Sequence, residues 1–279
     1  HLRVLAKLSR NLAEEIGRCV PADVPLWGDA LAGIEDLAAE LSDSAASQHA
    51  MRGEYTAEVA QRMTTWRMEV QERLTSNEQP VNMARMCQEL NNTLPEDGIL
   101  VADGGFAAHW TGLLCETKTA GRHYIANRGF ASIGYGLPGS MGAQLAAGER
   151  PVVGVTGDGG FNMVIGELET AGRLQLGLTI LIVNNAASGY VKALQQAQFG
   201  GRFQSSDLNE MNYANLAENF GCQGIRVEDP NDLAGAIRTG MAERDRPTVV
   251  DVVVTRDPTK MLPGVDNRTA PIKKGDRIA

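Results

Sequence analysis

Two polar residues, Asp158 and Asn185, each follow a run of apolar residues and carry oxygen atoms suited to a hard cation. Mg²⁺ takes about six oxygens at roughly 2.1 Å and normally binds one or two carboxylates together with phosphate oxygens. Gly159 and Gly160 follow the carboxylate, so their N–H groups would stand at the start of a helix, where the helix dipole favours an anion. The local prediction is a diphosphate bound through a metal ion. Taken alone, the Gly-Asp-Gly-Gly run is also compatible with a plain tight turn.

The elements around these residues predict how they are brought together. Residues 152–155 and 178–183 are continuous apolar runs, typical of strands buried on both faces of a parallel sheet. Residues 163–174 between them have helical spacing, so the whole forms one strand–helix–strand crossover. The carboxyl ends of both strands then point the same way, and Asp158 and Asn185 should lie side by side. Open α/β sheets bind ligands at that edge.

Several motifs in this region resemble those of one enzyme family. Gly-Asp-Gly at 157–159 is followed by Glu-Leu-x-Thr-Ala at 167–171 and by Asn-Asn at 184–185, with Asn185 27 residues after Asp158. This pattern resembles the cofactor motif of thiamine diphosphate enzymes. Residues 129–146 resemble the segment that holds the aminopyrimidine in the acetolactate synthase and 2-oxoacid decarboxylase branch. The resemblance covers roughly residues 78–265.

The resemblance implies roles for individual residues. Asp158 and Asn185 would bind Mg²⁺ through side-chain oxygens, with the Ala187 carbonyl as a third ligand. The Ala131 carbonyl and the Ile133 N–H would hydrogen-bond the pyrimidine. The Ile133 side chain would wedge between the two cofactor rings and bend the cofactor. Alternatively, Ile133 is an ordinary core residue. Gly159 and Gly160 would donate N–H groups to the diphosphate.

Other polar residues are more open to interpretation. Asn184 fits either a loop-stabilising amide or a phosphate contact. His109 follows the strand expected at 99–102, at the edge where active sites gather, and is a candidate for cofactor binding or for packing. Glu167 is expected to face the sheet and brace the glycine-rich loop, and Glu169 to be solvated. The family's synthases carry Gln-His-Gln-Met-Trp where this chain has Phe-Ala-Ala-His-Trp at 106–110, and only the Trp matches in place.

Composition excludes several other classes. The 279 residues carry a net charge of −8, which argues against binding nucleic acid through a basic face. The four cysteines are scattered without metal-type spacing and indicate reduced thiols in a cytoplasmic protein. No apolar run approaches the roughly 18 residues of a membrane helix. A dinucleotide site is disfavoured because no GxGxxG follows the first strand.

The expected fold class is α/β, a doubly wound parallel sheet flanked by helices, with a helical N-terminal remnant. The expected division is a middle-domain remnant at 1–42, a helical linker at 43–77, the cofactor-binding domain at 78–265 and a C-terminal arm at 266–279. Residues 186–209 are rich in Gln, Gly and Ser and suit a mobile loop that covers the site. The chain opens with His1 inside a helical pattern, which predicts a piece of a longer protein, with a processed native start as the alternative.

The resemblance implies a thiamine diphosphate-dependent carboligase or decarboxylase (a transferase or a lyase) acting on small 2-oxo acids, with Mg²⁺ as second cofactor. In that family the glutamate that activates the cofactor comes from a separate N-terminal domain, usually on a neighbouring subunit. We therefore expect a homodimer or homotetramer and no turnover by this chain alone. The alternatives are one chain of a two-chain enzyme, or a non-catalytic oligomerisation or regulatory module. The sequence leaves open the substrate, the choice between decarboxylation and carboligation, and whether the longer protein binds FAD.

Overall fold

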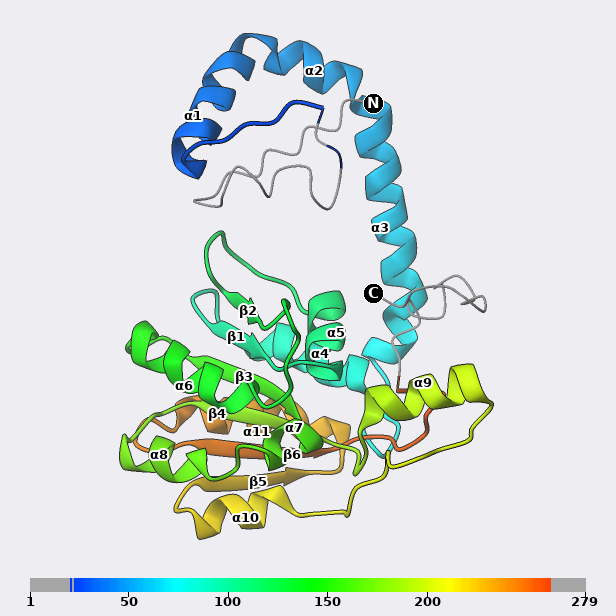
Figure 1. Ribbon diagram of the computed structural model, residues 1–279, viewed down its shortest axis with the longest axis vertical. Coiled ribbons are helices and arrows are strands. Elements are labelled where there is room, and N and C mark those ends of the chain that lie inside the picture. Colours follow the sequence, from blue (N-terminus) through cyan, green and yellow to red (C-terminus); the bar gives the residue numbers. More distant parts are fainter. Residues whose placement is uncertain (1–20, 22, 262–279) are drawn as a thin grey trace. The chain divides into compact units, whose positions relative to one another are not determined.

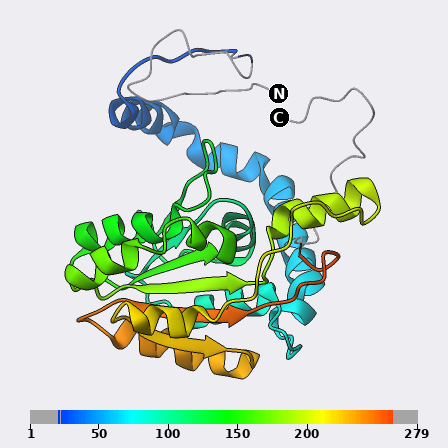
Figure 2. The ribbon, with the colours of Figure 1, turned by 60° about the horizontal axis from the view of Figure 1, so that its bottom comes forward.

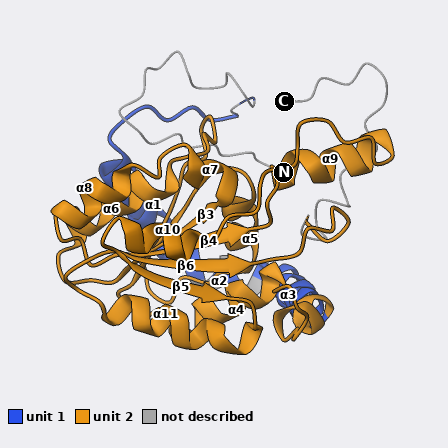
Figure 3. Cartoon of the chain, turned by 90° about the horizontal axis from the view of Figure 1, so that it is seen from below, with its two compact units in different colours: residues 1–68 blue, residues 69–279 orange. Residues whose placement is uncertain are grey.

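The computed structural model describes residue 21 and residues 23–261, and the chain divides into two compact units at 1–68 and 69–279 (Figure 3). The described part of the first unit is helical. Its helices are α1 (Ala30–Leu41), a short 3₁₀ turn (Ser42–Ser44), α2 (Ala45–Met51) and the start of α3 (Gly53–Leu74). Asp29 caps α1 by accepting hydrogen bonds from the N–H groups of Leu31 and Ala32 at 3.0 and 3.2 Å. The helical pattern expected within residues 1–20 lies outside the described residues.

The second unit is built on a six-stranded sheet in which every pair of neighbours is parallel. The strand order is β2-β1-β3-β4-β6-β5. The strands are β1 (Ile99–Ala102), β2 (Tyr124–Ala126), β3 (Val152–Gly157), β4 (Thr179–Asn184), β5 (Gln223–Val227) and β6 (Thr248–Val253). Strands β1 and β4 are buried at every residue, which matches their unbroken apolar sequence.

Helices cover both faces of this sheet (Figures 1 and 3). One face carries α6 (Gly136–Ala147), α8 (Glu167–Arg173) and α10 (Tyr213–Asn219), and the other carries α4 (Met83–Thr93), α5 (Phe106–Leu114) and α11 (Leu233–Ala242). A large apolar cluster fills the space between the sheet and helices α6, α8 and α10 and includes Leu137, Leu168, Ile180, Ile182 and Tyr213. This arrangement confirms the expected doubly wound α/β fold.

Two further helices lie at the carboxyl edge of the sheet. Helix α7 (Asp158–Asn162) follows β3 directly, and α9 (Gly189–Phe199) begins shortly after β4. The strand arrows point toward α9 in Figure 2. The edge predicted to bind a ligand is therefore built from strand tips and from the first turns of helices.

Three sequence expectations differ from the structure. The helix expected at 163–174 is interrupted, because residues 163–166 form tight turns with i→i−3 hydrogen bonds, such as Val164 N–H to the Phe161 carbonyl at 3.0 Å. The loop expected at 186–209 contains α9, which ends at Gly200 in the left-handed conformation (φ 62°). Strand β2 was not expected, because three half-buried residues at a sheet edge leave little sequence pattern. The tail from residue 262 onward lies outside the described residues.

Among the residues that the structure describes, no helix combines the length and the apolar character needed to cross a membrane.

Candidate cofactor site

A cleft opens at the carboxyl edge of the sheet, where the strand order reverses between β1 and β3. Such a reversal separates the loops that follow two neighbouring strands, and this leaves room for a ligand. The cleft is lined by residues that follow three strands: 103–106 after β1, 157–160 at the tip of β3, and 185 and 187–190 after β4, together with Ile133. Asp158 and Asn185, 27 residues apart in sequence, thus lie on the same cleft.

Asp158 is one of the two carboxylates that line this cleft. Its side chain is 2% exposed, and Oδ1 accepts a hydrogen bond from the Gly159 N–H at 2.7 Å. Oδ2 is buried and has no hydrogen-bond partner among the described residues. Burial raises the pKa of Asp158 to about 6, although the backbone N–H groups of Gly159 and residues 185–187 oppose that rise. Burying a charged oxygen without a partner costs free energy, and a cation bound at Asp158 Oδ2 would offset that cost.

Asn185 lies at the same edge of the sheet as Asp158 because β3 and β4 pair in parallel, with Gly157 beside Val183. The Asn185 side chain is buried, and its Oδ1 accepts from the Ala187 N–H at 3.1 Å. Ala186 between them has φ 46°, an unusual value for a residue with a Cβ, so the chain turns sharply here. This turn brings the backbone of residues 185–187 to the Asp158 carboxyl group.

The donor set fits Mg²⁺ bound together with a phosphate group. It offers one carboxylate, one amide oxygen and the backbone of a tight loop. No group of three or more His, Cys, Asp or Glu side chains suited to a metal occurs in the described part of the chain. A site with a single carboxylate needs its remaining negative charge from the ligand, as Mg²⁺ sites that hold substrate phosphates do.

Close backbone packing explains two of the glycines beside the cleft. A Cβ on Gly104 would stand 2.2 Å from the Ala131 carbonyl oxygen, and one on Gly160 would stand 2.6 Å from Asp103 Oδ2. Both positions therefore require glycine to keep the 131–134 segment against the tips of β1 and β3.

Asp103 fastens that segment, a role that the sequence did not reveal. Its buried carboxylate accepts from the Thr156 hydroxyl at 2.6 Å, and from the N–H groups of Gly134 at 3.1 Å and Tyr135 at 2.9 Å. A fourth bond comes from the Gly104 N–H at 2.7 Å. The only sequence signal is its position directly after a strand, because the three partners other than Gly104 lie 31 to 53 residues away.

Ile133 and Ala131 lie in the segment that Asp103 holds. The Ile133 side chain is 50% exposed and lines the cleft, so it is not a core position. Ala131 has φ 53°, in the left-handed region that a residue with a Cβ adopts at a cost. A strained backbone and an exposed branched apolar side chain beside a cleft are common features of ligand sites.

His109 lies on α5, with its ring edge-on to Tyr190 at a centroid distance of 5.0 Å. Tyr190 lines the cleft and also packs edge-on against Phe106 at 5.8 Å. His109 is therefore one aromatic layer away from the cleft. Trp110, its neighbour, is fully buried and donates its indole N–H to the Met261 carbonyl at 3.0 Å, which is a structural role.

The expectation for Glu167 is wrong, because the buried face of α8 is formed by Leu168 and Ala171 and leaves Glu167 exposed. Glu169 is solvated as expected and pairs with Arg173 at 3.0 Å. In α9, the Gln195 side chain bonds the backbone of Gln204 at 3.0 and 3.1 Å, so it fastens the following loop to the helix.

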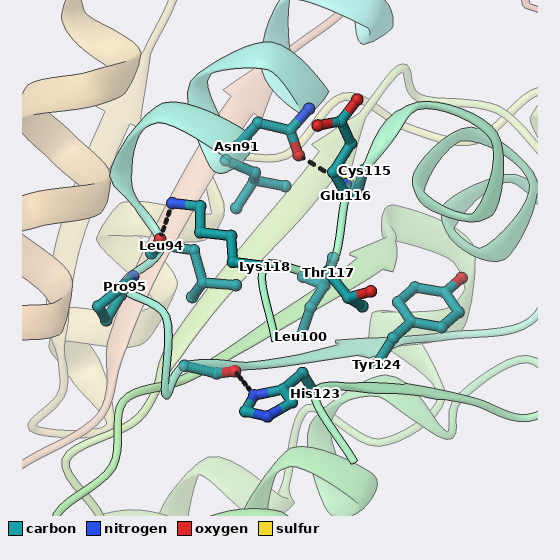
Figure 4. Close-up of a pocket in the computed structure, with 12 residues that line it drawn as sticks. Asn91, Leu94, Pro95, Leu100, Cys115, Glu116, Thr117, Lys118, His123 and Tyr124 are labelled. Atoms are coloured by element: carbon teal, nitrogen blue, oxygen red, sulfur yellow. Dashed lines mark hydrogen bonds between the residues drawn. The ribbon is translucent and has the colours of Figure 1, made fainter. Parts of the chain in front are cut away.

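A second hollow lies between the end of α4 and residues 115–118 (Figure 4). Its polar groups are engaged with one another: Asn91 accepts from the Glu116 N–H at 2.9 Å, and the His123 ring bonds the Gly98 carbonyl at 3.1 Å. Lys118 donates to the Leu94 carbonyl. These contacts fasten residues 115–123 to α4 and to the residues that lead into β1.

Comparison with known proteins agrees with this geometry. Residues 103–252 match the model of the thiamine pyrophosphate enzyme family, C-terminal TPP binding domain. This match covers more than half of the chain and includes the cleft residues at the tips of β1, β3 and β4. The chain belongs to this family, and its cofactor is thiamine diphosphate.

The chain is also similar to acetolactate synthase large subunits and to a solved decarboxylase structure. The acetolactate synthase large subunit of Porphyra purpurea is 32% identical over 168 residues, which are 60% of this chain and 28% of that protein. The acetolactate synthase large subunit of Parasynechococcus marenigrum (strain WH8102) is 31% identical over 251 residues, 87% of this chain and 38% of that protein. The Rhodococcus jostii RHA1 thiamine diphosphate-dependent 4-hydroxybenzoylformate decarboxylase superposes with a TM-score of 0.60 at 26% identity. That superposition covers 66% of this chain and 34% of the decarboxylase chain. The chain thus spans well under half of the length of these relatives.

Proposed function

We propose that this chain binds the magnesium diphosphate end of thiamine diphosphate in an enzyme that decarboxylates or ligates 2-oxo acids. The observation that carries the proposal is the buried Asp158 carboxylate, whose Oδ2 has no partner among the described residues and which shares a cleft with Asn185.

The metal ligands would be Asp158, Asn185 and the Ala187 carbonyl. The Gly159 and Gly160 backbone would bind the diphosphate, because these glycines stand in the first turn of α7. Remaining Mg²⁺ positions would be filled by diphosphate oxygens and water.

The thiamine end would lie along the segment held by Asp103. The Ala131 carbonyl and the Ile133 N–H are the proposed pyrimidine contacts, and the half-exposed Ile133 side chain would press between the rings. His109 is a proposed cofactor contact, because it packs on Tyr190, which lines the cleft.

When bound, thiamine diphosphate supplies the carbanion that attacks the carbonyl of a 2-oxo acid and the ring that accepts the electrons released. This chain's residues would hold and orient it and keep water from the buried carboxylate. The names of the relatives include a synthase and a decarboxylase.

Further parts of the proposal concern the whole protein. The activating glutamate would come from outside this chain, so the 279 residues alone would turn over no substrate. The whole protein would be a cytoplasmic homodimer or homotetramer. The division at 1–42, 43–77, 78–265 and 266–279 stays a prediction. Decarboxylation of pyruvate by the isolated chain would refute the claim of incompleteness.

Calorimetric titration tests the cofactor assignment. Thiamine diphosphate should bind the chain when Mg²⁺ is present and should bind much more weakly after chelation of the metal. If no heat of binding appears under either condition, a non-catalytic module that kept the fold becomes the better account.

A further inference from the structure

One fully buried carboxylate, Asp251, lies in the sheet away from the cofactor cleft. It stands on β6 beside Ile182 of β4 and shares that face of the sheet with α10. Its Oδ1 accepts from the Asn184 side-chain amide at 2.8 Å. Its Oδ2 accepts from the Tyr213 N–H at 3.0 Å and from the Arg226 guanidinium at 2.8 Å.

The first of these contacts fixes the strand tip that carries Asn185. The Asn184 amide also donates to the Met211 carbonyl at 2.9 Å, and the Asn184 carbonyl accepts from the Val254 N–H at 3.0 Å. Asn184 is thus held on both its side chain and its backbone. Of its two interpretations, the structure supports the loop-stabilising amide over the phosphate contact.

The second contact, with the Tyr213 N–H, connects Asp251 to the helix that begins with Asp158. Tyr213 begins α10, and its hydroxyl donates to Asn162 Oδ1 at 3.0 Å. Its ring packs edge-on against Phe161 at 5.7 Å. Asn162 and Phe161 belong to α7, the five-residue helix whose first residue is Asp158. Asp251 is therefore linked to both strand tips of the cleft by short chains of contacts.

The third contact pairs the buried carboxylate with a cation, the Arg226 guanidinium. Burial raises the pKa of Asp251 above its ordinary value, although the Asn184 amide and the Arg226 guanidinium oppose that rise. Arg226 is itself held by Glu228 at 2.7 Å and lies 3.5 Å from Glu210. Removing one partner of a buried ion pair leaves an uncompensated charge, so the geometry around Asp251 depends on Arg226.

We propose that Asp251, paired with Arg226, is a positioning residue that holds Asn185 and the Asp158 helix at the spacing that Mg²⁺ requires. This inference rests on the proposed function, because it assumes that these two residues bind the metal. Groups behind metal ligands orient those ligands, and their loss typically weakens metal binding by about 10 to 100-fold.

The test measures Mn²⁺ binding to the full chain at saturating thiamine diphosphate, by electron paramagnetic resonance of the free ion. Asp251→Asn should weaken Mn²⁺ binding about tenfold or more, and Arg226→Gln should do the same, whereas Arg226→Lys keeps the charge and should recover part of the affinity. Tyr213→Phe removes one oxygen atom and should weaken binding about threefold.

Val250→Ala is the matched control. Val250 is fully buried on the same strand, and alternation turns it to the opposite face from Asp251. It should lower the melting temperature and leave Mn²⁺ affinity within about twofold of the unmodified chain.

The outcomes separate the two claims. If the unmodified chain binds no Mn²⁺ with thiamine diphosphate, the proposed function fails and this inference fails with it. If the unmodified chain binds Mn²⁺ and the folded Asp251→Asn variant binds it with the same affinity, only the proposed positioning role of Asp251 is wrong. Equal weakening by Val250→Ala would also overturn it, because general destabilisation would then explain the effect. Should Asp251→Asn fail to fold, the Arg226 and Tyr213 variants decide by the same criterion.

Discussion

Replacing Asp158 with Asn should abolish metal-dependent cofactor binding without destabilising the unliganded chain. The usual pKa of this carboxyl group is 3.8, and burial raises the pKa of Asp158 to about 6. A difference of about two units corresponds to roughly 3 kcal/mol by which ionised Asp158 destabilises the unliganded fold at pH 7. Asp158→Asn removes that cost. Its amide NH₂ would face the backbone N–H groups of residues 185–187, which costs about 1–3 kcal/mol.

Together, these two effects predict that the free energy of unfolding of the unliganded variant is about 0 to 2 kcal/mol higher than that of the unmodified chain. For a unit of this size, 1 kcal/mol moves the melting temperature by roughly 2–4 °C. Thermal unfolding would be followed with and without thiamine diphosphate and Mg²⁺. The ligands should raise the melting temperature of the unmodified chain and have no effect on Asp158→Asn.

Either of two results would refute the reasoning. A variant several degrees less stable than the unmodified chain without ligands would show that Asp158 is a structural residue. A variant that is still stabilised by Mg²⁺ with thiamine diphosphate would show that the metal binds elsewhere. Glu169→Gln, which alters an exposed ion pair on α8, is the control and should change neither curve.

Cofactor binding with Mg²⁺ should weaken about tenfold per pH unit below about pH 6, because the metal needs ionised Asp158. Because folding raises the pKa of Asp158, the contribution of this group to the stability of the unliganded chain should instead fall as pH rises from about 4 through 6. Calorimetry of cofactor binding and thermal unfolding of the unliganded chain across pH 4–8 check these two opposite trends. Ile133→Ala should change stability by less than about 0.5 kcal/mol, as its side chain is half exposed, yet weaken thiamine diphosphate binding about tenfold through lost apolar contact; unchanged affinity would exclude the wedge. Gly104→Ala would meet the Ala131 carbonyl and should cost about 1–3 kcal/mol in denaturant unfolding, whereas Gly142→Ala on α6 has open space and should be neutral or stabilising.

The parts of the fold that sequence predicted are those set by local pattern. The runs before Asp158 and Asn185 are unbroken apolar segments, so both strands were evident. Parallel crossover geometry then required their tips to meet. The structure places both residues on one cleft for this reason.

Local composition misled the prediction for residues 186–209. Their Gln, Gly and Ser content predicts a loop, but residues 189–199 contain Lys, Ala, Leu and Gln, which form helices readily. The phase of α8 was also misjudged: Leu168 rather than Glu167 turns inward, because the preceding turns at 163–166 reset the helical register.

The supports of the site could not be inferred from sequence at all. Apart from the adjacent Gly104, the hydrogen-bond partners of Asp103 and Asp251 lie 25 to 67 positions away. These partners are backbone N–H groups, a hydroxyl, an amide and a guanidinium, and their spacing in the sequence gives no distinctive signal. Only the folded sheet, which brings β1 beside β3 and β4 beside β6, reveals these contacts.

A crystal structure of the chain grown with thiamine diphosphate and Mn²⁺ tests the central claim most directly, because Mn²⁺ can be located by anomalous scattering. The account predicts one strong peak bonded at about 2.1 Å to oxygens of Asp158 and Asn185, with the diphosphate on its far side. A peak on other residues, or a diphosphate bound away from the tips of β3 and β4, would contradict it.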